Sequence, residues 1–120
     1  MKNIVLIKHS SNWGLNEVDV LESSFNALKF YGYDKDVELS VLFVGRKKAR
    51  DLNIKYRNKD YYPQVLGFPM SREKDGDGVI RLGDVVICTQ KLKYEAIFQK
   101  KTIKNILDEW MLHGVENLLK

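Results

Sequence analysis

Residues 79–88 of the chain read VIRLGDVVIC and predict a strand rich in β-branched residues. Gly83 interrupts this pattern, which indicates a bulge or a close approach of another segment. Asp84 lies among apolar neighbours, so its carboxylate should be paired or hydrogen-bonded, either capping backbone or orienting a site. The preceding DGDG, residues 75–78, predicts the tip of a hairpin. This strand is therefore expected to anchor a sheet.

The segments around this strand predict the rest of the fold. Strand patterns cover residues 3–7, 37–44 and 65–69, and the first of these is apolar enough to be covered on both faces. Helical periodicity covers residues 17–31, 46–56, 91–98 and the segment after Thr102. Strands and helices that alternate in this order favour an α/β fold, with a single layer of helices packed on a mixed four-stranded sheet.

Two helix starts and one buried stripe can be assigned to particular residues. Asn16 and Thr102 each precede a helical pattern and can cap it with their side-chain oxygens. In the first helix, apolar residues that include Val18, Phe25 and Leu28 recur at helical spacing. We expect this stripe to face the core.

Composition bounds the class of protein. The chain has 120 residues, enough for one domain (1–120) with a single core. Basic residues are zoned: seven Lys/Arg against two acids from 46 to 60, and five against one from 91 to 104. Such zoning suits a polyanion such as RNA, although solvated helix faces have the same appearance. The lone Cys88 and the lack of a run near the roughly 20 apolar residues of a membrane span predict a cytoplasmic protein without membrane contact.

An irregular segment after the second helical pattern mixes cations and rings. Lys55, Arg57 and Lys59 stand beside Tyr61 and Tyr62. Cations can neutralise phosphates while aromatic rings stack on unpaired bases, so this segment predicts a single-stranded RNA contact. Ordinary loop packing of the two tyrosines is the alternative.

The last helical pattern carries a cluster with the look of a metal site. Glu109 and His113 are four residues apart and Glu116 follows three later, so all three share one surface of a helix. Either His113 is a metal ligand, or it packs near Trp110 and is hydrogen-bonded there. The other histidine, His9, lies in a loop and is expected to be solvent-exposed.

Four segments together resemble one family. LNIKYRNKD at 52–60, VLGFP at 65–69, LGDVVI at 82–87 and the pair His113-Gly114 follow one another in the family's order. The chain thereby resembles the YbeY family of bacterial rRNA-maturation endoribonucleases over about residues 38–117. The resemblance implies the YbeY-like α/β fold, a role in 16S rRNA maturation or ribosome quality control, and ribosomal RNA and the small ribosomal subunit as partners.

The resemblance also implies roles for single residues. The family cleaves single-stranded RNA with a zinc ion (Zn²⁺). The resemblance implies that Arg57 stabilises the charge of the phosphate and that His113 is the first metal ligand. Asn117 stands where the family has its second histidine, and the third lies beyond Lys120. Asp84 is expected to support the site residues from behind, without contacting the metal or the RNA itself.

Two functions remain open at this point. If a metal binds at His113, with Glu109 or Asn117 as helpers, the chain is an endoribonuclease. Without a metal there, the same scaffold is a non-catalytic RNA- or ribosome-binding module. The basic zones fit both functions.

Overall fold

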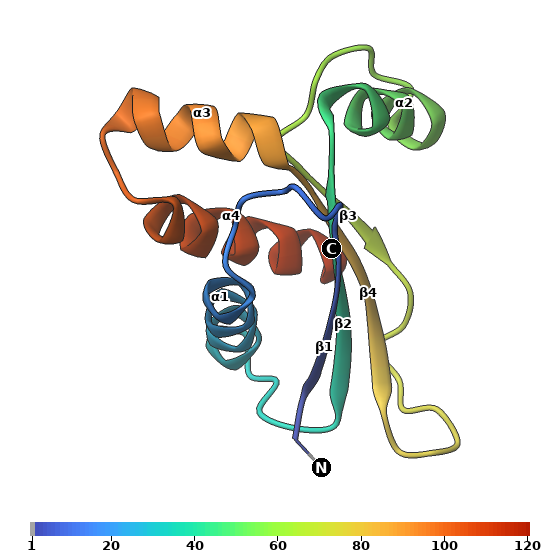
Figure 1. The fold of residues 1–120 in the computed structure, drawn as a ribbon. Coiled ribbons are helices and arrows are strands. Elements are labelled where there is room, and N and C mark those ends of the chain that lie inside the picture. The colour runs from blue at the N-terminus through green and yellow to red at the C-terminus, as the bar shows by residue number, and fades with distance from the viewer. Residues whose placement is uncertain (1) are drawn as a thin grey trace.

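The structure, a computed structural model, describes residues 2–120 (Figure 1). Its elements follow the predicted order closely. They are β1 (Ile4–Lys8), α1 (Glu17–Phe30), β2 (Val37–Val44), α2 (Arg46–Arg57), β3 (Val65–Pro69), β4 (Ile80–Cys88), α3 (Thr89–Gln99) and α4 (Ile103–Leu118).

The strands form one mixed sheet in the order β1-β2-β4-β3. β1, β2 and β4 run parallel, and β3 runs antiparallel to β4 at one edge. Figure 1 shows α1, α3 and α4 on one side of this sheet, whereas α2 lies on the other side near the carboxyl end of β4. The predicted α/β fold, with a layer of helices on a mixed four-stranded sheet, is confirmed, and α2 lies outside that layer.

The predicted irregularity at Gly83 is confirmed. Along β2 and β4, Glu38 pairs with Arg81 but Leu39 pairs with Gly83, so Leu82 is the extra residue of a bulge. Gly83 has a φ of 141°, and a Cβ there would lie 2.4 Å from the carbonyl oxygen of Phe68. Only glycine fits this position without strain.

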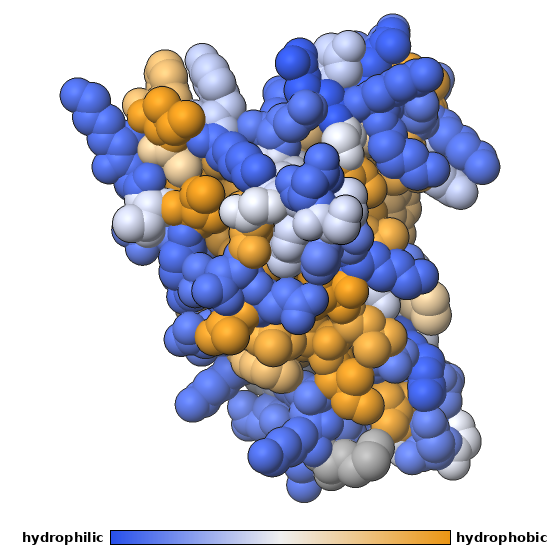
Figure 2. Space-filling view, in the orientation of Figure 1, coloured by the Kyte–Doolittle hydropathy of each residue, from blue (hydrophilic) through white to orange (hydrophobic). Residues whose placement is uncertain are grey.

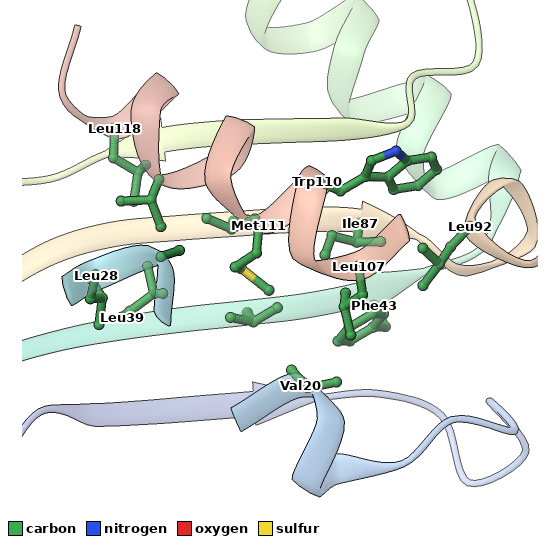
Figure 3. Close-up of a cluster of buried hydrophobic side chains, with 14 of the residues drawn as sticks. Val20, Leu28, Leu39, Phe43, Ile87, Leu92, Leu107, Trp110, Met111 and Leu118 are labelled. Atoms are coloured by element: carbon green, nitrogen blue, oxygen red, sulfur yellow. The ribbon is translucent and has the colours of Figure 1, made fainter. Parts of the chain in front are cut away.

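The main core lies between the sheet and the helix layer. Figure 3 shows Leu107, Met111 and Leu118 of α4 beside the strands that carry Leu39 and Ile87. All five side chains are at most 1% exposed. Each such burial contributes roughly 1.5–3 kcal/mol relative to an exposed side chain. This packing determines which face of α4 points to solvent.

Local signals in the sequence also hold. The Asn16 side chain accepts a hydrogen bond from the backbone N–H of Val18 at 2.8 Å, and Thr102 accepts one from Asn105 at 3.1 Å. A turn closes at residues 75–78, where the N–H of Gly78 donates to the carbonyl of Asp75 at 2.9 Å. Cys88 is a buried free thiol.

Two predictions about burial are wrong, the first of them in part. In α1, Leu28 of the predicted stripe is buried in the core, but Val18 is 60% exposed and Phe25 is 40% exposed, while Ser23 and Ser24 are buried. The buried hydroxyls are satisfied, because Ser23 donates to Asp108 and Ser24 donates to a carbonyl within the helix.

The second wrong prediction concerns β1. It is an edge strand with alternating exposure rather than a strand covered on both faces, and Figure 2 shows apolar residues at the surface in this region.

Among residues 2–120, no helix combines the length and the apolar character that a membrane span requires.

Candidate functional site

A hollow of about 480 Å³ opens at the sheet edge where β3 begins. α2 ends on one side of it, and α4 passes on the other. Its lining includes Arg57, Gln64 and Val65, together with His113 and Asn117 of α4. The structure therefore brings Arg57 and His113, which are 56 positions apart in the sequence, to one site.

The position of His113 follows from the packing of its neighbour. A Cβ at Gly114 would lie 2.6 Å from Cγ1 of Val85, so this turn of α4 rests directly on β4. His113 is one residue earlier, about 100° round the helix, and its side chain is exposed. Among residues 2–120 its ring has no hydrogen-bond or ion-pair partner. The alternative that His113 is packed and hydrogen-bonded is therefore wrong.

Arg57 is held in place by its own loop. Its Nη1 lies 3.4 Å from Oδ1 of Asn53 and 3.3 Å from the hydroxyl oxygen of Tyr61, to both of which it donates. Asn53 is fully buried and also donates to the Tyr61 carbonyl at 3.3 Å. Tyr61 thus positions the guanidinium, a role that the prediction of base stacking did not include.

Tyr62 is engaged in a similar way. The guanidinium of Arg46 lies 4.7 Å from its ring centroid, and that of Arg50 lies 5.9 Å away. Arg50 also pairs with Asp60 at 2.7 Å, and this hydrogen bond raises the pKa of Arg50 and lowers that of Asp60. Both predicted stacking tyrosines therefore already contact arginines.

Two further cations border the same end of α2. Lys55 and Lys59 are exposed, and the Lys55 ammonium lies 5.1 Å from the Tyr56 ring centroid. Neither lysine forms an ion pair with a carboxylate within residues 2–120. Neither lines the hollow, and Lys55 lies about 200° round α2 from Arg57, so the structure does not bring these two predicted residues to the site.

The carboxylates that could help His113 have partners of their own. Glu109 pairs with Lys101 at 3.1 Å. Glu116 accepts a hydrogen bond from the hydroxyl of Tyr31 at 3.0 Å and lies 3.8 Å from Lys120. Desolvation, followed by the bond to Glu116, raises the pKa of Tyr31, so this phenol stays protonated and donates.

The residues present do not fit a zinc ion. A catalytic zinc ion needs three protein ligands, and imidazole, thiolate and carboxylate are the suitable groups. Residues 2–120 hold no group of three or more His, Cys, Asp or Glu side chains arranged for a metal. Asn117 offers only a neutral amide oxygen, which zinc binds poorly. His113 is thus an isolated donor in the described chain.

His9 does not supply a second imidazole. Its Nε2 lies 3.2 Å from a Glu17 carboxylate oxygen, and its ring stacks on Trp13 with centroids 3.7 Å apart. It is not part of the lining around His113.

Asp84 also lies outside the hollow. In the sheet it pairs with Ser40 on one side and Phe68 on the other, on the face opposite the main core. Its carboxylate is half-buried and has no hydrogen-bond or ion-pair partner among residues 2–120. The prediction that Asp84 is paired or hydrogen-bonded is therefore wrong.

Other polar residues of the hollow were missed by the sequence reasoning. Gln64, Glu95 and Gln99 all line it. None stands in a motif with recognisable chemistry. Glu95 and Gln99 do share one face of a helix at a spacing of four, which could have marked them as a pair, and they are hydrogen-bonded at 2.7 Å.

The fold and the hollow define an α/β protein with an exposed imidazole and a guanidinium at one sheet edge. The family model described as Endoribonuclease YbeY matches residues 12–119. The chain belongs to the YbeY family.

Curated relatives support this membership. Proteins named Endoribonuclease YbeY from Acinetobacter baumannii and Idiomarina loihiensis are 36% and 39% identical to the chain over 95 and 89 residues. These matches cover 77% and 72% of this chain and 60% and 52% of the relatives, so the chain spans little more than half of their length. The solution structure of TM1509 from Thermotoga maritima shares the fold, with a TM-score of 0.62 and 23% identity over 98% of this chain and 73% of that one.

Proposed function

We propose that this chain binds single-stranded ribosomal RNA in the hollow and acts, in the cytoplasm and on the small ribosomal subunit, in 16S rRNA maturation or ribosome quality control. One observation carries the proposal: Arg57 and His113 line the same hollow, beside the basic end of α2. The endoribonuclease relatives make RNA the expected ligand.

Each basic residue has a distinct part in this binding. The Arg57 guanidinium, oriented by Asn53 and Tyr61, can donate two hydrogen bonds to one phosphate. Lys55 and Lys59 add charge without fixed geometry. Binding of this kind releases counterions, so its affinity falls as salt rises.

A titration of a labelled single-stranded oligoribonucleotide at several salt concentrations tests the proposal. We expect Arg57→Ala to weaken binding about tenfold, as the loss of a charged hydrogen bond implies, and Lys59→Ala to weaken it less. Arg72→Ala is the matched control, because Arg72 is exposed and lies outside the lining. Undetectable or salt-independent binding, or equal losses in Arg57→Ala and Arg72→Ala, contradicts the proposal.

RNA cleavage is the second candidate function. The observation that favours it is the exposed and unpartnered ring of His113, in the same hollow as a guanidinium that can stabilise charge developing on a phosphate. The donor set of residues 2–120 does not complete a zinc site, so a metal step is not assigned to these residues.

Elemental analysis of the purified protein, together with a cleavage assay, separates the two functions. Cleavage that is sensitive to chelators and lost in His113→Ala supports the endoribonuclease. Metal-free protein whose background cleavage is the same in wild type and His113→Ala leaves the binding module as the function. Asn117→His is a useful third variant, because it places two imidazoles four residues apart and should raise zinc retention.

A further inference from the structure

α3 exposes two aromatic rings that the fold does not use. Tyr94 is 62% exposed and Phe98 is 68% exposed. Their ring centroids lie 6.0 Å apart with an interplanar angle of 17°, so the rings form an offset, nearly parallel pair. Neither belongs to the core cluster. Figure 2 shows apolar atoms on the outer surface of α3 among hydrophilic neighbours.

Tyr94 also borders a second hollow, of about 420 Å³. Arg46, Gln64, Lys91 and Glu95 line it together with Tyr94. Gln64 and Glu95 line the hollow around His113 as well. The two hollows are therefore adjacent, and a ligand that leaves the His113 site past Gln64 reaches Tyr94.

The charge around this second hollow is mainly positive. Arg46 and Lys91 stand in its lining with Glu95 as the acidic residue. Exposed rings interleaved with cations provide the two contacts that single-stranded nucleic acid needs, a face for a base and charge for the backbone.

We propose that Tyr94, with Phe98 behind it, is a nucleobase-stacking subsite for single-stranded RNA, whose backbone contacts Arg46 and Lys91. This inference rests on the proposed function and extends it to a second hollow. The predicted stacking on Tyr61 and Tyr62 stays a separate prediction. Those rings contact arginines, whereas the Tyr94 ring contacts only Phe98 among the ring contacts of residues 2–120 and is 62% exposed beside the second hollow.

A protein partner is the rival occupant of this surface. Ile97, 79% exposed, lies on the same helix between the two rings in sequence. Charge complementarity favours RNA, because the surrounding cations match a polyanion. A protein contact would use Ile97 as well as the rings, which gives the experiment its control.

The test compares three variants in the oligoribonucleotide titration, with a fluorescent 2-aminopurine base in the RNA to report stacking. Tyr94→Ala should weaken binding about tenfold and reduce the change in 2-aminopurine fluorescence, since one stacked base is lost. Tyr94→Phe retains a ring and should bind within twofold of wild type. Ile97→Ala removes apolar surface without a ring and should also bind within twofold. Both positions are exposed, and equal urea midpoints will show that the fold is retained.

The outcomes distinguish this inference from the proposed function. If wild type binds RNA and Arg57→Ala weakens it while Tyr94→Ala does not, the stacking subsite is wrong and the proposed function stands. If wild type does not bind RNA, both fail. If Ile97→Ala weakens binding as much as Tyr94→Ala, or if both variants abolish a concentration-dependent dimer in sedimentation, the surface is an apolar protein contact and the inference is overturned.

Discussion

Two adjacent residues of α4 differ in their surroundings: Gly114 packs against β4, whereas His113 lines the hollow and is exposed. At Gly114 and Gly83 the backbones approach so closely that a Cβ would lie 2.6 Å from Val85 and 2.4 Å from Phe68, respectively. At His113 the side chain is exposed and has no partner within residues 2–120. Close packing requires glycine at positions 83 and 114, whereas no contact within residues 2–120 requires an imidazole at position 113.

This difference separates the residues that the fold requires from those that line the site. Changing a glycine at the contact forces backbone or core side chains to move, which costs free energy of unfolding. Changing an exposed rim residue leaves the packing intact and costs little. The glycine motifs therefore identify the fold, while the chemistry depends on residues that the fold does not need.

Gly83→Ala should be the most damaging change on the packed side. The added Cβ meets the Phe68 carbonyl oxygen, and alanine is strained at a φ of 141°. We expect a loss of roughly 2–5 kcal/mol in the free energy of unfolding, measured by urea denaturation. Gly76→Ala is the control, because nothing lies within 4 Å of its Cβ, and it should change stability by less than about 0.5 kcal/mol. Equal effects in the two variants would contradict the close approach.

Gly114→Ala should cost less. Alanine gains about 1 kcal/mol over glycine within a helix, but overpacking against Val85 costs about 1–3 kcal/mol, so a net loss of about 1 kcal/mol is expected. A double-mutant cycle with Val85→Ala isolates the clash, and a coupling of at least about 1 kcal/mol should appear. Additive effects would mean that Gly114 does not rest on Val85.

The same contrast separates the features that could be predicted from the sequence from those that could not. Glycines, caps and alternating apolar residues act locally, so the bulge at Gly83 and the caps at Asn16 and Thr102 were predicted correctly. The buried face of α1 was predicted only in part: Leu28 is buried, but Ser23 and Ser24 are buried too, with satisfied hydroxyls, while apolar Val18 and Phe25 face out. Counting apolar residues cannot detect a polar residue whose partner comes from a distant helix.

The site was harder to predict for a related reason. The resemblance pointed to Arg57 and His113, but only the fold brings them to one hollow. Glu109 contacts Lys101, in the loop before α4, and Glu116 contacts Tyr31, at the end of α1. No spacing in the sequence marks such pairs, since they depend on where α1 and the loop before α4 pack.

A smaller effect is expected where charges rather than packing hold the start of β4. Hydrogen bonds, first from Arg81 and then from the backbone of Val79, lower the pKa of Asp77 from 3.8 to about 2. A lowered pKa in the folded state gives stability that is present above about pH 4 and is lost as the pH falls towards 2. The urea midpoint of wild type should drop over this range, and that of Asp77→Asn should drop less. Identical profiles would show that the pair contributes nothing to folding.

His113→Ala should have the smallest effect on stability, and this makes it the sharpest test of the comparison. The ring is exposed and unpartnered, so its removal should change the free energy of unfolding by less than about 0.5 kcal/mol. If the fold requires the imidazole, the urea midpoint will fall as it does for Gly114→Ala, and the separation of packing from chemistry is wrong. If stability is unchanged while RNA cleavage or affinity falls, His113 serves function alone. A residue with that combination contributes to the chemistry of the site and not to the stability of the fold.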